Sequence, residues 1–115
     1  MFRKLENYQN ELLWIKCLED GLEVFMNLYN RYKLPDILEA AKKQKALIGK
    51  EKKSLRVVTQ TIKKLDDPLL SDILKMRYID GLTLEQTSEA LFFSYTHTSR
   101  LVRKAKRQLT EITNN

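Results

Sequence analysis

Apolar side chains recur at alternating steps of three and four residues through the first part of the chain, and this spacing predicts helices. Over residues 2–33 the repeat extends for about four heptads. Its seam consists of Leu5, Tyr8, Leu12, Ile15, Leu22, Met26 and Tyr29. The chain has two prolines, three glycines and no strand-type alternation, so we expect the all-α fold class.

The helix expected over residues 2–33 is apolar over more than one stripe. Four further residues widen the seam: Trp14, Leu18, Phe25 and Tyr32. This width predicts packing against more than one neighbour. Gly21 costs about 1 kcal/mol inside a helix, so we expect the helix to be continuous or kinked there. Cys17 is the single cysteine, which excludes an internal disulfide and a cysteine-based zinc site, and its apolar surroundings predict a buried thiol.

A second long helix is expected from Asp36 to Leu65, because Pro35 stops one helix and is tolerated in the first turn of the next. Its seam consists of Ile37, Ala41, Ile48, Leu55, Val58, Ile62 and Leu65, with Gln44 and Glu51 as polar interruptions. Two long helices with a short connection predict an antiparallel helical hairpin over residues 1–65. Such a hairpin does not bury all its apolar surface alone. We therefore expect it to pair with a second copy, as a homodimer, or to dock onto the C-terminal part.

The net charge of +6 comes from residues 35–65, where nine basic residues face three acidic ones. Five of these cations are predicted to share one outer helix face: Lys42, Lys45, Lys52, Arg56 and Lys63. A basic face attracts polyanions, but it also occurs as an ordinary solvated surface. Both interpretations stay open for this patch, including a clamp that holds nucleic acid without sequence preference.

Residues 66–115 are predicted to form a separate unit of short helices. Asp67 followed by Pro68 is typical of a helix start, and Gly81 fits the left-handed residue that ends the helix. Thr83 and Gln86 have the spacing of a capping box, which predicts a helix from Leu84 to Leu91. Ser94 then caps a last helix that extends to about Ile112.

The last helix is strongly basic: residues 94–110 contain five Lys or Arg and no acid. Its inward face is predicted to consist of Thr98, Leu101, Ala105, Leu109 and Ile112. Its outward face would hold Tyr95, Thr96, Ser99, Arg100, Arg103, Lys104 and Arg107. A cationic helix supported by a second helix suits the DNA major groove, so the pattern predicts binding to double-stranded DNA.

The stretch MRYIDGLTLEQTSEALFFSYTHTSRLVRKAKRQL resembles region four of bacterial sigma factors, a helix-turn-helix that reads promoter DNA. The chain as a whole is similar to small phage-encoded transcriptional regulators of the ArpU and RinA type. The resemblance implies sequence-specific control of transcription in the cytoplasm of a bacterial host, without a cofactor. It also implies a supporting helix over residues 84–91 and a recognition helix from residue 94.

The resemblance assigns roles to residues of these two helices. It implies base reading by Tyr95, Thr96, Ser99 and Arg100, and phosphate contacts by Thr83, Arg103, Lys104 and Arg107. Four positions depart from the pattern: Thr87, Ser88, Phe92 and Thr98. The pattern has glycine at the place of Phe92, where a turn needs positive φ. Either the turn therefore has another geometry, or the unit serves a role other than DNA reading.

Other classes of function fit the residues less well. His97 is the single histidine, no second ligand or base stands at useful spacing, and glycine-rich phosphate loops are absent, so we expect neither an enzyme nor a metal site. No apolar run predicts a signal peptide or a membrane span. A protein adaptor that binds RNA polymerase is the main alternative, with Phe92, Phe93 and Tyr95 as an aromatic anchor. The plainer expectation is that Phe92 and Phe93 fill the core.

Overall fold

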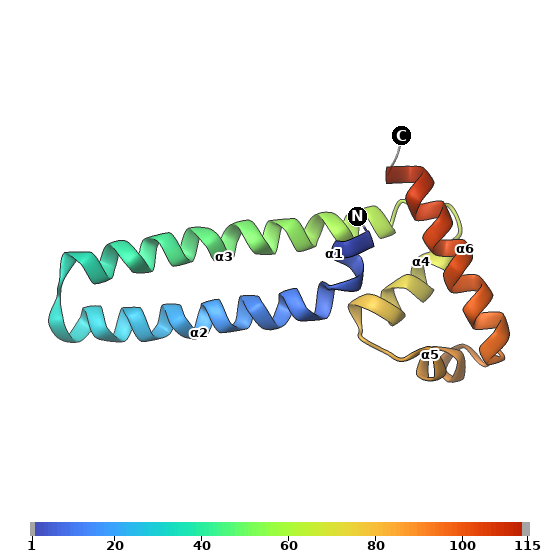
Figure 1. Cartoon of the computed structure of the whole chain (residues 1–115), viewed down its shortest axis with the longest axis horizontal. Helices are drawn as coiled ribbons and strands as arrows, with labels where there is room; N and C mark the ends of the chain where they lie inside the picture. Colours follow the sequence, from blue (N-terminus) through green and yellow to red (C-terminus); the bar gives the residue numbers. More distant parts are fainter. Residues whose placement is uncertain (1, 114–115) are drawn as a thin grey trace. The chain divides into compact units, whose positions relative to one another are not determined.

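The computed structural model describes residues 2–113, with side chains from Arg3 onward. In this range the chain forms six α-helices and one π-helical turn, and no strand. The elements are α1 (Phe2–Glu6), α2 (Tyr8–Tyr32), α3 (Pro35–Ile62), α4 (Pro68–Leu74), η1 (Lys75–Ile79), α5 (Leu84–Leu91) and α6 (Tyr95–Thr113) (Figure 1). The predicted all-α class is confirmed.

The chain divides into two compact units. The two-helix unit holds residues 10–55, and the C-terminal unit holds residues 2–9 together with residues 56–113. The division expected from the sequence lay between residues 65 and 66. The first turns of the chain and the end of α3 thus belong to the C-terminal unit, because their apolar side chains enter its core.

In the two-helix unit, α2 and α3 lie side by side and run in opposite directions (Figure 1). A short stripe of apolar side chains is buried between them: Ile15, Leu18, Ala41, Ile48 and Leu55. Gln44 interrupts this stripe, and its side-chain amide donates a hydrogen bond of 3.1 Å to the carbonyl of Leu18. A Cβ on Gly21 would lie 3.1 Å from the Gln44 Nε2 atom, so glycine leaves room for the amide.

The ends of these helices differ in part from the sequence expectation. Helix α2 continues without a break through Gly21, and the interruption falls instead at Asn7, between α1 and α2. Lys33 adopts a left-handed conformation with φ of 54°, and Pro35 then begins α3. The expectation of a buried thiol is wrong, since Cys17 is exposed. Leu12 and Met26 of the predicted seam are also exposed, because α3 covers a single stripe of α2.

The core of the C-terminal unit is formed by segments that are distant in the sequence. It consists of Leu5, Val58, Ile62, Leu65, Leu70, Leu74, Ala105 and Leu109. Helix α4 begins as predicted, with the Asp67 carboxylate accepting a hydrogen bond of 2.9 Å from the Leu69 amide and Pro68 in the first turn. Four of these eight core residues lie on α4 and α6, so the core fixes α6 against α4.

Helix α4 passes into the π-helical turn η1, which the sequence did not predict. The side-chain amide of Gln9 donates hydrogen bonds to the carbonyls of Tyr78 and Ile79 near the end of this turn. The Arg77 guanidinium donates to the carbonyl of Leu82 at 3.0 Å, and Gly81 has the predicted left-handed conformation with φ of 75°. These bonds hold the loop that leads into α5.

Candidate nucleic-acid interface

Helix α5 begins with a reciprocal cap. The Thr83 hydroxyl accepts a hydrogen bond from the Gln86 amide at 3.1 Å, and the Gln86 side chain accepts one from the Thr83 amide at 2.9 Å. This arrangement confirms the predicted capping box, and α5 has the predicted bounds. Thr83 is exposed, so its hydroxyl and the start of α5 stand open to solvent. The cap uses the amides of Thr83 and Gln86, and the positive end of the helix dipole still attracts an anion to this end.

The turn between α5 and α6 has the left-handed geometry that the family pattern reserves for glycine. Phe92 adopts φ of 58° and ψ of 33°, and the amide of Phe93 donates to the carbonyl of Ser88 at 3.1 Å. A residue with a Cβ adopts this conformation at a cost of about 1 kcal/mol. The expectation of another turn geometry is therefore wrong, because Phe92 adopts the left-handed conformation in spite of its side chain.

The Phe92 side chain is 96% exposed, so the expectation that it fills the core is wrong. Phe93 is half-buried, and its ring meets the ring of His97 edge to face with 4.9 Å between the centroids. Because Phe92 is held by the backbone of the turn, its ring points away from the apolar residues beneath it. The turn therefore presents an aromatic ring to solvent close to the first turn of α6.

Thr87 on α5 and Thr98 on α6, two of the four positions that depart from the sigma-like pattern, are fully buried. The Thr87 hydroxyl donates to the carbonyl of Thr83 at 2.9 Å, and the Thr98 hydroxyl donates to the carbonyl of Ser94 at the same distance. Ser88 is also buried, and its hydroxyl donates to the carbonyl of Glu85. Hydroxyl groups in the core are costly only when they lack a partner. Because these three hydroxyl groups are hydrogen-bonded, they are compatible with the packing of α5 against α6.

Helix α6 starts at the predicted cap, where the Ser94 hydroxyl accepts a hydrogen bond from the His97 amide at 3.1 Å. Its buried face consists of Thr98, Val102, Ala105 and Leu109. Val102 was missing from the predicted face, although steps of four, three and four residues from Thr98 point to it. Leu101 and Ile112 are half-buried at the edges of this face.

The opposite face of α6 carries the predicted contact residues. Tyr95, Thr96, Arg100, Arg103, Lys104 and Arg107 are exposed, and Ser99 is half-buried. Among residues 3–113, none of the side chains of Arg100, Arg103, Lys104 and Arg107 has a hydrogen bond, ion pair or ring contact. From Arg100 to Arg107 the helix rises by about 10 Å. Four positive charges are thus presented along two turns of one helix.

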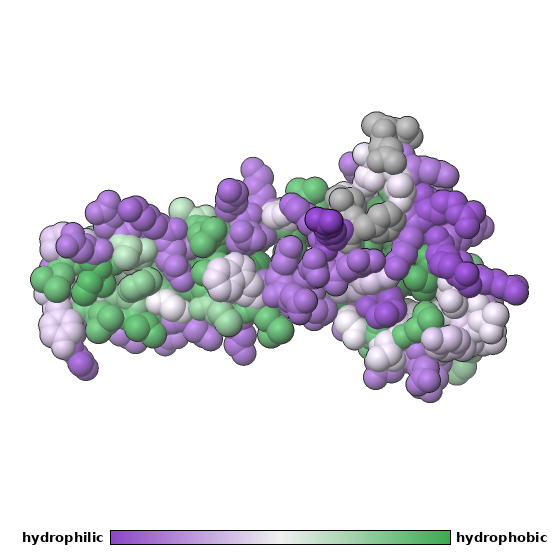
Figure 2. All heavy atoms as spheres, viewed as in Figure 1, coloured by the Kyte–Doolittle hydropathy of each residue, from purple (hydrophilic) through white to green (hydrophobic). Residues whose placement is uncertain are grey.

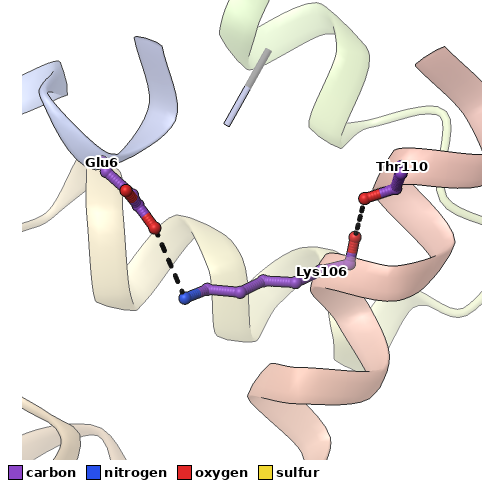
Figure 3. Close-up of polar contacts among 3 residues, drawn as sticks. All are labelled: Glu6, Lys106 and Thr110. Atoms are coloured by element: carbon purple, nitrogen blue, oxygen red, sulfur yellow. Dashed lines mark hydrogen bonds and ion pairs between the residues drawn. The ribbon is translucent and has the colours of Figure 1, made fainter. Parts of the chain in front are cut away.

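The fifth cation of this helix, Lys106, is used within the C-terminal unit. Its ammonium group lies 3.8 Å from a carboxylate oxygen of Glu6 (Figure 3). The same group lies 5.2 Å from the centroid of the Tyr78 ring. Thr110 donates a hydrogen bond to the carbonyl of Lys106 one turn further along. Neighbouring lysines of α6 therefore differ: Lys106 braces the fold, whereas Lys104 extends into solvent.

The second basic patch predicted from the sequence falls in two units. Lys42, Lys45 and Lys52 belong to the two-helix unit, and Arg56 and Lys63 belong to the C-terminal unit; all five are exposed. Lys42 and Lys45 line an open hollow with apolar residues of α2. Lys52 is paired with Glu19 at 3.3 Å, which neutralises part of its charge. The five predicted cations therefore do not all lie in one unit.

Residues 2–113 contain no group of three metal-ligating side chains. None of the helices in this range is long and apolar enough to cross a membrane. Comparison with protein families, curated proteins and solved structures gives no match to this chain. The site is thus defined by its geometry and charge.

Proposed function

We propose that the C-terminal unit binds double-stranded DNA and reads its sequence with α6 in the major groove. The observation that carries this proposal is the set of four exposed cations on α6 that have no partner in residues 3–113. DNA carries one negative charge for about every 1.7 Å of its axis, so such a row finds several phosphates within reach. The buried face of α6 rests on α4 and α5, which supports the helix from behind.

The order of residues along α6 supports a division of labour. Its first two turns carry Tyr95, Thr96, Ser99 and Arg100, and the cations Arg103, Lys104 and Arg107 follow. We assign base contacts to the first group, in which Arg100 has the donor fork that pairs with guanine. We assign phosphate contacts to the second group and to Thr83 at the start of α5.

The proposed biological role is control of transcription from a bacterial or phage promoter, which follows from the resemblance to sigma region four. We further propose that two copies act together. A twofold pair reads two half-sites about 34–36 Å apart along the duplex, one helical turn from centre to centre. This pairing sets the spacing of the two α6 helices but does not change what each of them contacts.

The proposal is tested by selecting bound duplexes from a random pool with the purified full chain. We expect one enriched motif. The Arg100→Ala variant should then bind the enriched duplex about 5- to 150-fold more weakly and random duplex nearly as well as before, because a bidentate base contact contributes about 1–3 kcal/mol. Equal losses of affinity on both duplexes would contradict the base-reading role of Arg100. A pool without an enriched motif would contradict sequence-specific binding.

A second candidate function is a protein adaptor that contacts RNA polymerase. The exposed ring of Phe92, next to the exposed ring of Tyr95, favours it, because aromatic side chains dominate interface hot spots. The Phe92→Gly variant separates the two functions, since glycine accepts the left-handed turn. An adaptor loses its partner in this variant, whereas a DNA reader keeps its affinity for the enriched duplex.

A further inference from the structure

Helix α2 has a second apolar face, distinct from the stripe that packs against α3. This face, the outer strip, consists of Leu13, Trp14, Cys17, Val24, Leu28 and Tyr32. All six residues are exposed in a single copy of the chain; Leu13 retains 63% and Val24 retains 56% of its accessible surface. Figure 2 shows hydrophobic residues at the surface along the two-helix unit.

The spacing of the outer strip is that of a helix-packing seam. Trp14 and Cys17 are three residues apart, and Val24 and Leu28 are four apart, so at 3.6 residues per turn they lie on one face. The buried stripe of α2 repeats the same pattern one position away, at Ile15 and Leu18. An apolar stripe that is this wide needs a partner on each side.

We infer that a second copy of this chain covers the outer strip, so that the two α2 helices pack against each other about a twofold axis. Two pairs of helices joined in this way make a four-helix bundle, an arrangement that supplies the core a single pair lacks. This inference rests on the proposed pairing of two copies, but it is independent of DNA reading.

The area of the outer strip agrees with the requirement of a stable dimer. Five large side chains that are 38–63% exposed, together with Cys17, offer on the order of 500 Å² of apolar surface per copy. A standard interface takes about 800 Å² from each partner, and in homodimers about 65% of that is apolar. The strip thus provides the apolar part of one interface of standard size.

The charge of the outer strip permits contact between two copies. The strip itself contains no ionisable group other than the Cys17 thiol and the Tyr32 phenol, so twofold contact brings no like charges into its centre.

The inference is tested with the full chain and no DNA. Val24→Lys places an ammonium group near the middle of the outer strip, whereas the matched control Asn30→Lys adds the same charge at an exposed polar position on another face of the same helix. By sedimentation equilibrium the unaltered protein should reach twice the 13.6 kDa of one chain. Val24→Lys should raise the dimer Kd by about 100-fold or more, because a buried charge stays unpaired. Asn30→Lys should change it by less than about threefold.

The reactivity of the single thiol, Cys17, also reports dimer formation in the unaltered protein. The rate at which Cys17 reacts with a maleimide should fall about tenfold as the unaltered protein is concentrated through its dimer Kd, and Val24→Lys should react at the fast rate throughout. A mass of one chain at every concentration would overturn the inference. So would equal effects of the two lysine variants, or a Cys17 reaction rate that does not depend on concentration.

Discussion

Leu109 and Val24 lie on helices with the same apolar periodicity, but the first is 1% exposed and the second 56% exposed. The difference reflects the number of neighbours each helix has in its own unit. In the C-terminal unit, α6 packs on α4 and α5, and its core draws side chains from α3 and from the first turns of the chain. In the two-helix unit, α2 has α3 as its single neighbour, so apolar side chains such as Leu13 and Val24 stay exposed.

The two units also treat their charged residues differently. The C-terminal unit satisfies one lysine of α6 through Glu6 and Tyr78 and leaves four cations on the opposite face without a partner. The two-helix unit pairs Lys52 with Glu19 across its helices, leaves lysines such as Lys42 and Lys45 exposed, and also exposes apolar residues of α2. We therefore assign the apolar face of α2 to a second copy and the unpartnered cations of α6 to a polyanion.

The largest expected effect is on stability. Leu109→Ala should lower the free energy of unfolding by about 3–4 kcal/mol, because it leaves a cavity in an enclosed core, whereas Ile48→Ala in the two-helix unit should cost about 2 kcal/mol. Urea denaturation measures both, and Val57→Ala, at an exposed position, serves as the control with a change within about 0.5 kcal/mol. Equal losses for Leu109→Ala and Ile48→Ala would contradict the contrast between the two cores.

A smaller effect separates the two kinds of lysine on α6. Lys104→Ala should weaken DNA binding by roughly fivefold and reduce the magnitude of the salt slope by about 1, because one phosphate contact is lost. Lys106→Ala should leave that slope unchanged and lower stability by up to about 1 kcal/mol, since its ion pair and ring contact are partly exposed. Fluorescence anisotropy at several salt concentrations measures the slope. The assignment fails if Lys106→Ala changes it as much as Lys104→Ala does.

The smallest expected effect concerns the turn before α6. Phe92→Gly should raise the free energy of unfolding by about 1 kcal/mol, because glycine removes the cost of the left-handed conformation and the lost ring makes little contact. Phe92→Ala keeps the Cβ and should give no such gain. Thermal unfolding of both variants checks this, and a gain shared equally by the two would show that the conformation of the turn is not the cause.

Features with a local cause could be predicted from the sequence. The cap at Asp67, the left-handed Gly81, the box of Thr83 and Gln86 and the cap at Ser94 each depend on residues within one turn, and the structure confirms them. The all-α class follows from periodicity alone. The sequence also predicted correctly which residues of α6 are exposed on its outward face, apart from Ser99, which is half-buried.

Features that depend on contacts between distant residues could not be predicted. The π-helical turn η1 is held by Gln9, nearly 70 residues earlier. Lys106 does not belong to the exposed basic face of α6, because it forms an ion pair with Glu6. Cys17 is exposed because α3 covers another stripe of α2. The exposure of Phe92 follows from the backbone of its turn, which hydropathy does not indicate.

The measurement that tests the central claim most directly is the salt dependence of binding to the enriched duplex. The three cations of α6 assigned to phosphates, Arg103, Lys104 and Arg107, should release about three counterions for each bound copy. The logarithm of the association constant should then fall against the logarithm of salt concentration with a slope of about −2.7 per copy, and affinity should drop about 40-fold per copy between 50 and 200 mM salt. A slope between 0 and about −1 would contradict the claim, because those three side chains would then not lie against phosphates.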